Sequence, residues 1–327
     1  MRLALALPLF AALAACSVPE PPASPPQTQA PPRAELMKWP ALLERPRPEP
    51  DSTIAYGSDQ MQKVDLWLPA GPGPHPTVLM VHGGCWQTEI ADRRIMNWIA
   101  DDLRKRGIAV WNIDYRGVDR TGGGYPGTFA DSAAAADSLR VHAGRHKLDI
   151  SPLVAVGHSA GGHLALWLAA RRAASRRPSN PLVPNRSPIL AADPLRIDTV
   201  VSLGGLPDLE LAATPPGSGC GTEVVEKLVG PPTLSSRNVY ADTSIPRLAP
   251  LGVRQVLING LQDRIIPTSY AEDYASKMRS AGDTVKVRMI DRTGHVELIA
   301  PETAAWAATV EEIKAGLRRH SGEGRNP

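Results

Sequence analysis

Short apolar runs alternate with helical patterns along most of the chain. Six runs have the composition of buried strands, at 77–84, 108–117, 153–159, 197–205, 254–260 and 284–290. Apolar residues at helical spacing separate them, at 93–107, 129–146, 160–173, 269–282 and 301–319. Because parallel strands that are covered on both faces are apolar throughout, this alternation predicts an α/β fold with a mostly parallel sheet and helices on both faces. An antiparallel hairpin over 51–57 and 61–69 is expected at the sheet edge, which gives about eight strands in all.

Two segments interrupt this alternation. Residues 171–196 are rich in arginine and proline, and residues 206–250 are mixed, with a short helix expected at 223–230. Long irregular insertions in a regular domain usually have a function, as covers or lids. We therefore predict a small cap or lid over 206–250. Surface decoration is the alternative, and it is a sufficient explanation for the first segment.

The pentapeptide Gly157-His158-Ser159-Ala160-Gly161 stands where a predicted strand gives way to a predicted helix. A G-x-S-x-G turn is so tight that only glycines fit beside the serine, and it exposes the hydroxyl at the carboxyl end of the sheet. The positive N-terminus of the following helix favours negative charge that develops there. Ser159 is therefore the predicted nucleophile, and a structural serine in a glycine-rich turn is the alternative.

A serine hydroxyl needs a base that takes its proton and a third group that holds the base. His295 is the predicted base because it follows the last predicted strand and precedes the final helix. Asp263 follows the fifth predicted strand and is the predicted acid. Asp208, which follows the fourth strand, is the rival acid, and Glu297 is too close in sequence to His295 to orient it easily.

The loop after the first predicted strand carries the letters "HGGCW". Its glycines let the backbone approach a substrate, and preset N–H groups at such a place stabilise the oxyanion of a tetrahedral intermediate. We predict donors at Gly84 and Ala160, with Gly83 or Cys85 as alternatives. His82 is expected to fix this loop by hydrogen bonding.

Three further side chains are predicted to border the substrate pocket, namely Cys85, Trp86 and His158. For Trp86, simple packing in the core explains the sequence equally well. His163 lies in the helix after the serine turn and is expected to pack there.

The first 15 residues have the pattern of an export signal. After a basic start, the apolar stretch 3–15 is shorter than the ~20 residues that a membrane-spanning helix needs, so it is predicted to be a signal peptide. It ends in "LAAC", which resembles a bacterial lipobox in which Cys16 is acylated. An ordinary secretory signal with an incidental cysteine is the alternative. Ser17 is typical of sorting to the outer membrane, so we expect a lipid-anchored protein of the cell envelope that faces the periplasm.

Residues 16–50 are proline-rich and are predicted to be a disordered tether of ~3 Å per residue. The catalytic domain is expected over 51–319, and a disordered tail over 320–327. With Cys16 lipidated, Cys85 and Cys220 remain as an even pair in an oxidising compartment. A disulfide between them and two separate thiols both fit the sequence.

A net charge of +3 is small for 327 residues and gives no reason to expect a nucleic-acid partner. The chain carries no ligand cluster such as the H-E-x-x-H pattern of zinc hydrolases, and no cofactor is expected.

The motifs "HGGCW", "DYRG", "GHSAGGHLA", "QDRIIP" and the later "GH" together resemble the α/β-hydrolase superfamily over about residues 55–318. More narrowly, they resemble the esterase/lipase group that includes carboxylesterases and kynurenine-formamidase-like enzymes. The chain order of Ser159, Asp263 and His295 is that of α/β-hydrolases. The resemblance implies this triad and no metal. Cys85 replaces the third glycine of the H-G-G-G loop, which favours the formamidase-like branch.

The expected function is hydrolysis of carboxylic esters through a Ser-His-Asp triad and an acyl-enzyme intermediate. An aryl formamidase or other amide hydrolase is the first alternative. It fits a lipid anchor less well, because tryptophan catabolism is cytosolic. A catalytically silent envelope lipoprotein that uses the fold to bind a ligand is the second. The sequence carries no signal for acyl chain length or oligomeric state.

Overall fold

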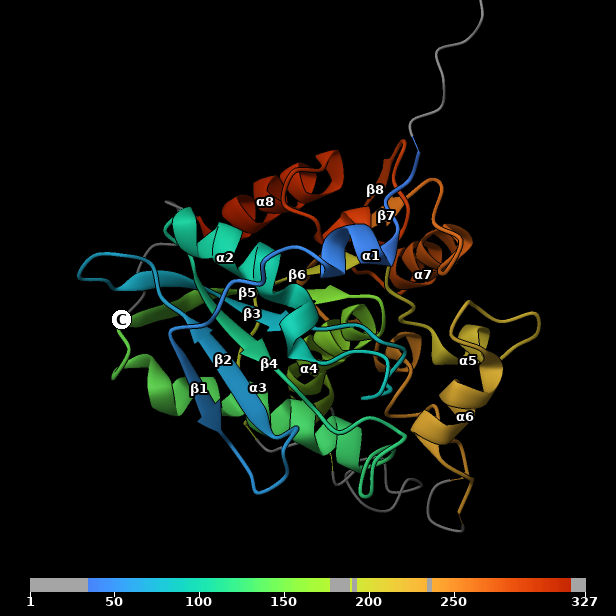
Figure 1. Cartoon of the computed structure of the whole chain (residues 1–327). Coiled ribbons are helices and arrows are strands. Elements are labelled where there is room, and N and C mark those ends of the chain that lie inside the picture. The colour runs from blue at the N-terminus through green and yellow to red at the C-terminus, as the bar shows by residue number, and fades with distance from the viewer. Residues whose placement is uncertain (1–34, 177–188, 190–192, 234–236, 319–327) are drawn as a thin grey trace, which may run out of the picture. The chain divides into compact units, whose positions relative to one another are not determined.

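A single mixed sheet forms the centre of the computed structural model, which describes residues 35–176, 189, 193–233 and 237–318 (Figure 1). Its strands are β1 (Ser52–Ala55), β2 (Lys63–Trp67), β3 (His75–Val81), β4 (Ala109–Ile113), β5 (Leu148–His158), β6 (Thr199–Leu203), β7 (Arg254–Gly260) and β8 (Val285–Ile290). The spatial order is β1-β2-β4-β3-β5-β6-β7-β8. The pairs β1–β2 and β2–β4 are antiparallel, and all other neighbours are parallel. The predicted fold class is confirmed.

Helices connect the parallel strands, and one more helix lies at each end of the domain. Within the described residues the helices are α1 (Trp39–Leu43), α2 (Asn97–Lys105), α3 (Gly127–Ala143), α4 (Ala160–Arg176), α5 (Leu209–Ala212), α6 (Thr222–Val229), α7 (Ser269–Ser280) and α8 (Ala304–Leu317). Short 3-10 helices lie at Arg93–Met96, Ile245–Leu248 and Glu297–Ile299. In this part of the chain no helix has the length and apolar character needed to cross a bilayer.

Successive residues of the central strands face opposite sides of the sheet. In β3, Val78 and Met80 pack with α2 and α8, whereas Leu79 and Val81 pack with α3 and α4. All four side chains are fully buried. The two helical layers therefore explain why the strands are apolar without interruption.

The segment predicted as a lid contains α5, α6 and the 3-10 helix Ile245–Leu248. Val225 and Leu228 on α6 are fully buried and join the core of the α3/α4 side. The predicted helix at 223–230 is thus α6, and it packs against the body of the domain. Of the earlier insertion, residues 177–188 and 190–192 lie outside the described residues.

The prediction of a disordered tether over 16–50 is wrong for residues 36–50, which we call the N-terminal strap. Leu42 on α1 is fully buried, and the carbonyls of Pro46 and Pro48 accept hydrogen bonds from the side chains of Trp98 (3.1 Å) and Asn97 (2.9 Å). The compact unit begins at Leu36 and not at residue 51.

The proline content explains why the strap was not predicted. Prolines cannot extend a sheet or continue a helix, but they leave their carbonyl oxygens free to accept hydrogen bonds from the body. The predicted signal peptide at 1–15, the lipidation site at Cys16 and the tail at 320–327 lie outside the described residues.

Candidate active site

The turn between β5 and α4 holds Ser159 in a left-handed conformation, with φ of +55°. A Cβ on Gly157 would lie 2.0 Å from the carbonyl oxygen of Gly161, and one on Gly161 would lie 2.2 Å from that of Val81. Both glycines are therefore required by close backbone approach. A non-glycine residue at positive φ is strained, and such strain is often found at functional sites.

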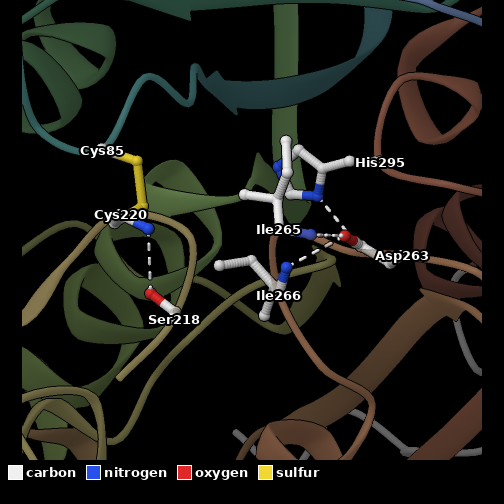
Figure 2. Close-up of a disulfide and its surroundings, with 7 residues drawn as sticks. All are labelled: Cys85, Ser218, Cys220, Asp263, Ile265, Ile266 and His295. Carbon is white, nitrogen blue, oxygen red and sulfur yellow. Dashed lines mark hydrogen bonds and ion pairs between the residues drawn. A yellow bond between two sulfur atoms is a disulfide. The ribbon is translucent and has the colours of Figure 1, made fainter. Parts of the chain in front are cut away.

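The predicted acid and base are in direct contact. Asp263, in the loop after β7, is 9% exposed, and its Oδ2 lies 2.6 Å from Nδ1 of His295, which is 6% exposed. The other carboxylate oxygen accepts the N–H groups of Ile265 (2.8 Å) and Ile266 (2.9 Å). Figure 2 shows how these bonds fix the carboxylate against the imidazole. Because an ionised carboxylate accepts only, Nδ1 carries a proton and Nε2 is left to act as a base.

Ser159 lies at the same edge of the sheet. Its N–H donates to the carbonyl of Leu203 (2.8 Å), and a Cβ on the next residue, Gly204, would lie 3.2 Å from both Asp263 Oδ2 and His295 Nδ1. The Ser159 hydroxyl and His295 Nε2 make no hydrogen bond to a described residue. The structure thus joins acid and base directly and leaves the hydroxyl and Nε2 unpaired. In ligand-free enzymes catalytic hydrogen bonds are often long and tighten only with substrate.

The loop after β3 packs directly on the serine. A Cβ on Gly83 would lie 2.9 Å from Cβ of Ser159, and Gly84 has φ of +107°. The N–H groups of Gly83, Gly84 and Ala160 donate to no residue that the structure describes. Ala160 opens α4, so its N–H has no acceptor within the helix. Of the predicted oxyanion donors, Gly83 and Ala160 thus lie beside Ser159, and none of the three N–H groups has a partner among the described residues.

His82 holds this loop in place, as expected. Its Nδ1 lies 2.6 Å from the carbonyl oxygen of Gly83 and its Nε2 lies 2.9 Å from Asp114 Oδ1, while Arg93 binds the other oxygen of Asp114 (2.9 Å). The Tyr115 hydroxyl donates to the carbonyl of His82 (3.0 Å), and the two rings stack at 4.3 Å.

Sequence reasoning did not assign a role to Arg93, Asp114 or Tyr115. The signal that could have found Asp114 and Tyr115 is the "DYRG" motif at the end of a predicted strand. Arg93 gives no comparable signal, because its contact depends on where the 3-10 helix Arg93–Met96 lies. Asp114 and Tyr115 bind His82 in the loop after β3, and Arg93 binds Asp114 and Asp65.

The predicted pocket role of Trp86 is wrong. The side chain is fully buried, and its ring meets the His163 ring edge-on at 5.5 Å, because the loop turns it into the core. His163 packs as expected, with Nε2 at 2.8 Å from the carbonyl oxygen of Thr243. Burial lowers the pKa of His163 to about 4. This imidazole is therefore neutral at physiological pH.

The predicted pocket role of His158 is also wrong, since this residue is 1% exposed and packs against His295. Its Nε2 donates to the carbonyl of His295 (3.2 Å), and the two rings are 4.4 Å apart. Burial lowers the pKa of His158 well below its usual range, and the positive charge that His295 can carry lowers it further. His158 is thus a neutral support for His295.

The rival acid, Asp208, serves a different purpose. Its Oδ1 accepts the N–H of Leu211 (3.3 Å) at the start of α5 and the hydroxyl of Ser244 (3.1 Å). Its Oδ2 binds Lys277 (2.5 Å) on α7. Asp208 therefore ties the insertion to the body, and Asp263 is the carboxylate that holds His295.

Cys85 and Cys220 form a disulfide in the structure. Next to it, the N–H of Gly219 donates to the carbonyl of Ile265 (2.7 Å), whose own N–H binds Asp263. The disulfide therefore links the oxyanion loop to the insertion and, through the insertion, to the acid loop (Figure 2). Among the described residues, no cluster of three or more histidine, cysteine, aspartate or glutamate side chains is arranged to hold a metal.

Comparisons with known proteins place the chain in a family. The BD-FAE family model matches residues 64–278. A probable isoprenylcysteine alpha-carbonyl methylesterase of Oryza sativa subsp. japonica is 25% identical over 255 residues. That alignment covers 75% of this chain, and the chain spans only 58% of the length of the relative.

Solved structures share the fold at low identity. A truncated carbohydrate esterase from gut microbiota is 18% identical, with a TM-score of 0.65, over 82% of this chain and 96% of the other. Esterase B from Lactobacillus rhamnosis is 17% identical, with a TM-score of 0.65, over 83% and 88%. Esterase 2 of Thermogutta terrifontis, phosphonylated by sarin, is 19% identical, with a TM-score of 0.62, over 86% and 97%.

The expected resemblance to the esterase/lipase group of α/β-hydrolases is confirmed by these matches, which do not test the narrower formamidase-like branch. Since the family model spans well over half of the sequence, the chain belongs to the BD-FAE family of α/β-hydrolases.

Proposed function

We propose that this protein is a serine hydrolase that cleaves carboxylic esters, with Ser159, His295 and Asp263 as its triad. The observation that carries the proposal is the 2.6 Å contact between Asp263 and His295 beside a serine held at positive φ. The unpaired N–H groups of Gly84 and Ala160 add the donors that an oxyanion requires.

The reaction follows from the roles of these groups. Nε2 of His295 takes the hydroxyl proton while Ser159 Oγ forms a bond to the ester carbonyl carbon, whose oxygen becomes an anion bound by the N–H groups of Gly84 and Ala160. The oxyanion collapses, the bond to the alcohol breaks, and the His295 imidazolium protonates the departing oxygen. Water, deprotonated by His295, then attacks the acyl carbon. The bond between that carbon and Ser159 Oγ breaks, His295 returns the proton to Oγ, and the acid is released. Asp263 stabilises the imidazolium in both halves.

The similar proteins support this proposal, since they are named as esterases. The phosphonylated state of the Thermogutta terrifontis esterase provides a direct precedent for the test. Fluorophosphonates react with a serine only when it is activated, so the probe should label the wild-type protein and should not label Ser159→Ala. Ser138→Ala is the matched control, since Ser138 lies on α3 and bonds only the carbonyl of Ala135.

Substrate class is decided by a panel with p-nitrophenyl acetate, longer acyl esters, an acetylated sugar, a methyl ester and N-formylkynurenine. We expect the acyl esters to be hydrolysed and Ser159→Ala to be inactive. Preferential cleavage of N-formylkynurenine would replace the ester proposal by the amide alternative. A wild-type protein that hydrolyses none of these and takes no fluorophosphonate would be a binding lipoprotein.

We further propose that Cys16 is acylated and anchors the enzyme in the cell envelope, facing the periplasm. The support is the lipobox-like "LAAC" at residues 13–16. Radiolabelled palmitate should enter the wild-type chain, and Cys16→Ser should abolish the labelling and release the enzyme into the soluble fraction. Equal membrane retention of both forms would contradict the proposal.

A further inference from the structure

The N-terminal strap runs from beside β8 through α1 toward α2 (Figure 1). One of its residues, Trp39, lies beside His295. The Trp39 ring is half-buried and lies 6.4 Å from the His295 ring at an interplanar angle of 72°. It lies at the same distance from the His158 ring, at 69°. With 4.4 Å between the two imidazoles, three aromatic rings from three distant segments form one cluster.

A carboxylate joins the backbone of the strap to the histidine loop. Glu297 is 7% exposed, and its Oε1 accepts the N–H of Met37 at 2.5 Å. Its Oε2 accepts the N–H of Gly294, the residue directly before His295, at 3.0 Å. Glu297 therefore does act on the catalytic histidine, but through the backbone and not through the ring.

The pair of Asp263 and His295 alone does not fix the direction of Nε2. One hydrogen bond to Nδ1 still lets the imidazole rotate about the line that joins the two groups. Contacts with the ring of His295 from His158 and Trp39 restrict that rotation, and edge-to-face ring contacts at 4.5–7 Å are attractive. The hydrogen bonds of Glu297 hold the main chain from which the ring extends.

We propose that the strap is a working part of the active site, in which Trp39 and Glu297 are positioning residues that aim His295 at Ser159. This inference rests on the proposed hydrolase function and adds to it a segment that precedes the matched family region, residues 64–278. The Ser-His-Asp set supplies the reacting groups, and the strap limits how far the base can turn.

A purely structural strap is the competing explanation, and the chain offers controls for it. Leu43 lies on α1, within the strap, and is 40% exposed. Leu43→Ala therefore changes the strap on its exposed surface and leaves the Trp39 and Glu297 contacts in place. Trp39→Phe keeps an aromatic ring in the cluster.

The test measures kcat, KM and the pH profile of kcat/KM for p-nitrophenyl acetate with the full chain. We expect Trp39→Ala to lower kcat about 2- to 12-fold with little change in KM, as the loss of one ring contact predicts, and to shift the acidic limb of the profile. Glu297→Gln should lower kcat in the same way, because its amide nitrogen cannot accept an N–H. Trp39→Phe should recover most of the rate, and the control variant Leu43→Ala should keep the wild-type rate.

Two results would overturn the inference: a Trp39→Ala kcat within the error of wild type, or an equal loss in Leu43→Ala at matched melting temperature. Proton NMR separates this failure from failure of the proposed function. The Nδ1 proton of His295 should exchange with water at least about twofold faster in Trp39→Ala than in wild type or Leu43→Ala, whether or not the ester is cleaved. A wild-type protein without activity would refute the hydrolase proposal, and unchanged exchange would refute the role of the strap.

Discussion

Opening the disulfide between Cys85 and Cys220 should lower the free energy of unfolding by several kcal/mol. The two cysteines are 135 residues apart. The entropy of closing a loop of this length gives about 5 kcal/mol as the stabilisation that the cross-link provides by restricting the unfolded chain. Removal of native disulfides generally costs between about 2 and 5 kcal/mol, so we expect a loss in the upper part of that range.

Activity should fall along with stability, because the bridge is part of a chain of contacts around the site. Cys220 adjoins Gly219, whose N–H binds the carbonyl of Ile265, and Ile265 in turn binds the Asp263 carboxylate. Reduction frees the oxyanion loop on one side and the acid loop on the other. We expect kcat to fall before the protein unfolds.

Urea unfolding of the wild-type protein with and without dithiothreitol measures the effect, and free thiols are counted to show that the bridge has opened. The double variant Cys85→Ala/Cys220→Ala is the control, since dithiothreitol should not change its stability. If the fully reduced wild type unfolds within about 1 kcal/mol of the oxidised protein, the loop-entropy reasoning is refuted for this fold.

Three further predictions concern the site and the core. Asp263→Asn should keep the fold and lower kcat by about 10⁴, since an amide no longer stabilises the required imidazole tautomer; Asp208→Asn should leave kcat near wild type in the same assay. Gly161→Ala should abolish soluble, active protein, because its Cβ would lie 2.2 Å from the Val81 carbonyl oxygen, and normal expression with normal kcat would contradict this. His163 is neutral in the folded protein and has a pKa of about 4 there. Its contribution to the free energy of unfolding is therefore fully present above pH 6.5 and is lost as the pH falls toward 4. This contribution is about 3 kcal/mol. In urea unfolding at a series of pH values, the free energy of unfolding should therefore change less steeply with pH in His163→Gln than in the wild type.

The sequence was most informative where local rules act. Each predicted central strand corresponds to a strand of the sheet, because burial on both faces requires apolar residues throughout. The glycines around Ser159 reveal the turn for a similar reason, since at Gly157 and Gly161 no side chain fits. Asp263 and His295 could be chosen because parallel strands bring their carboxyl ends to one edge of the sheet.

The predictions were wrong where contacts between distant parts of the chain determine the direction of a side chain or the structure of a segment. Trp86 and His158 stand beside catalytic groups in the sequence, but their side chains turn into the core, and neighbouring positions do not reveal that direction. The strap was misassigned because its composition resembles that of a disordered tether. Leu42 packs among core residues that lie far along the chain. The N–H of Met37 binds the carboxylate of Glu297, which is 260 positions away. Neither contact leaves a periodic pattern.

The strap also determines which part of the domain would bear a mechanical force applied at its N-terminal side. Within the strap, the N–H of Met37 binds Glu297 and the ring of Trp39 lies 6.4 Å from the ring of His295. A mechanical force on the strap would therefore act on the loop that carries His295, the proposed general base, and not on the sheet alone. A shortened protein that began at Asp51 would lack both of these contacts and the buried side chain of Leu42.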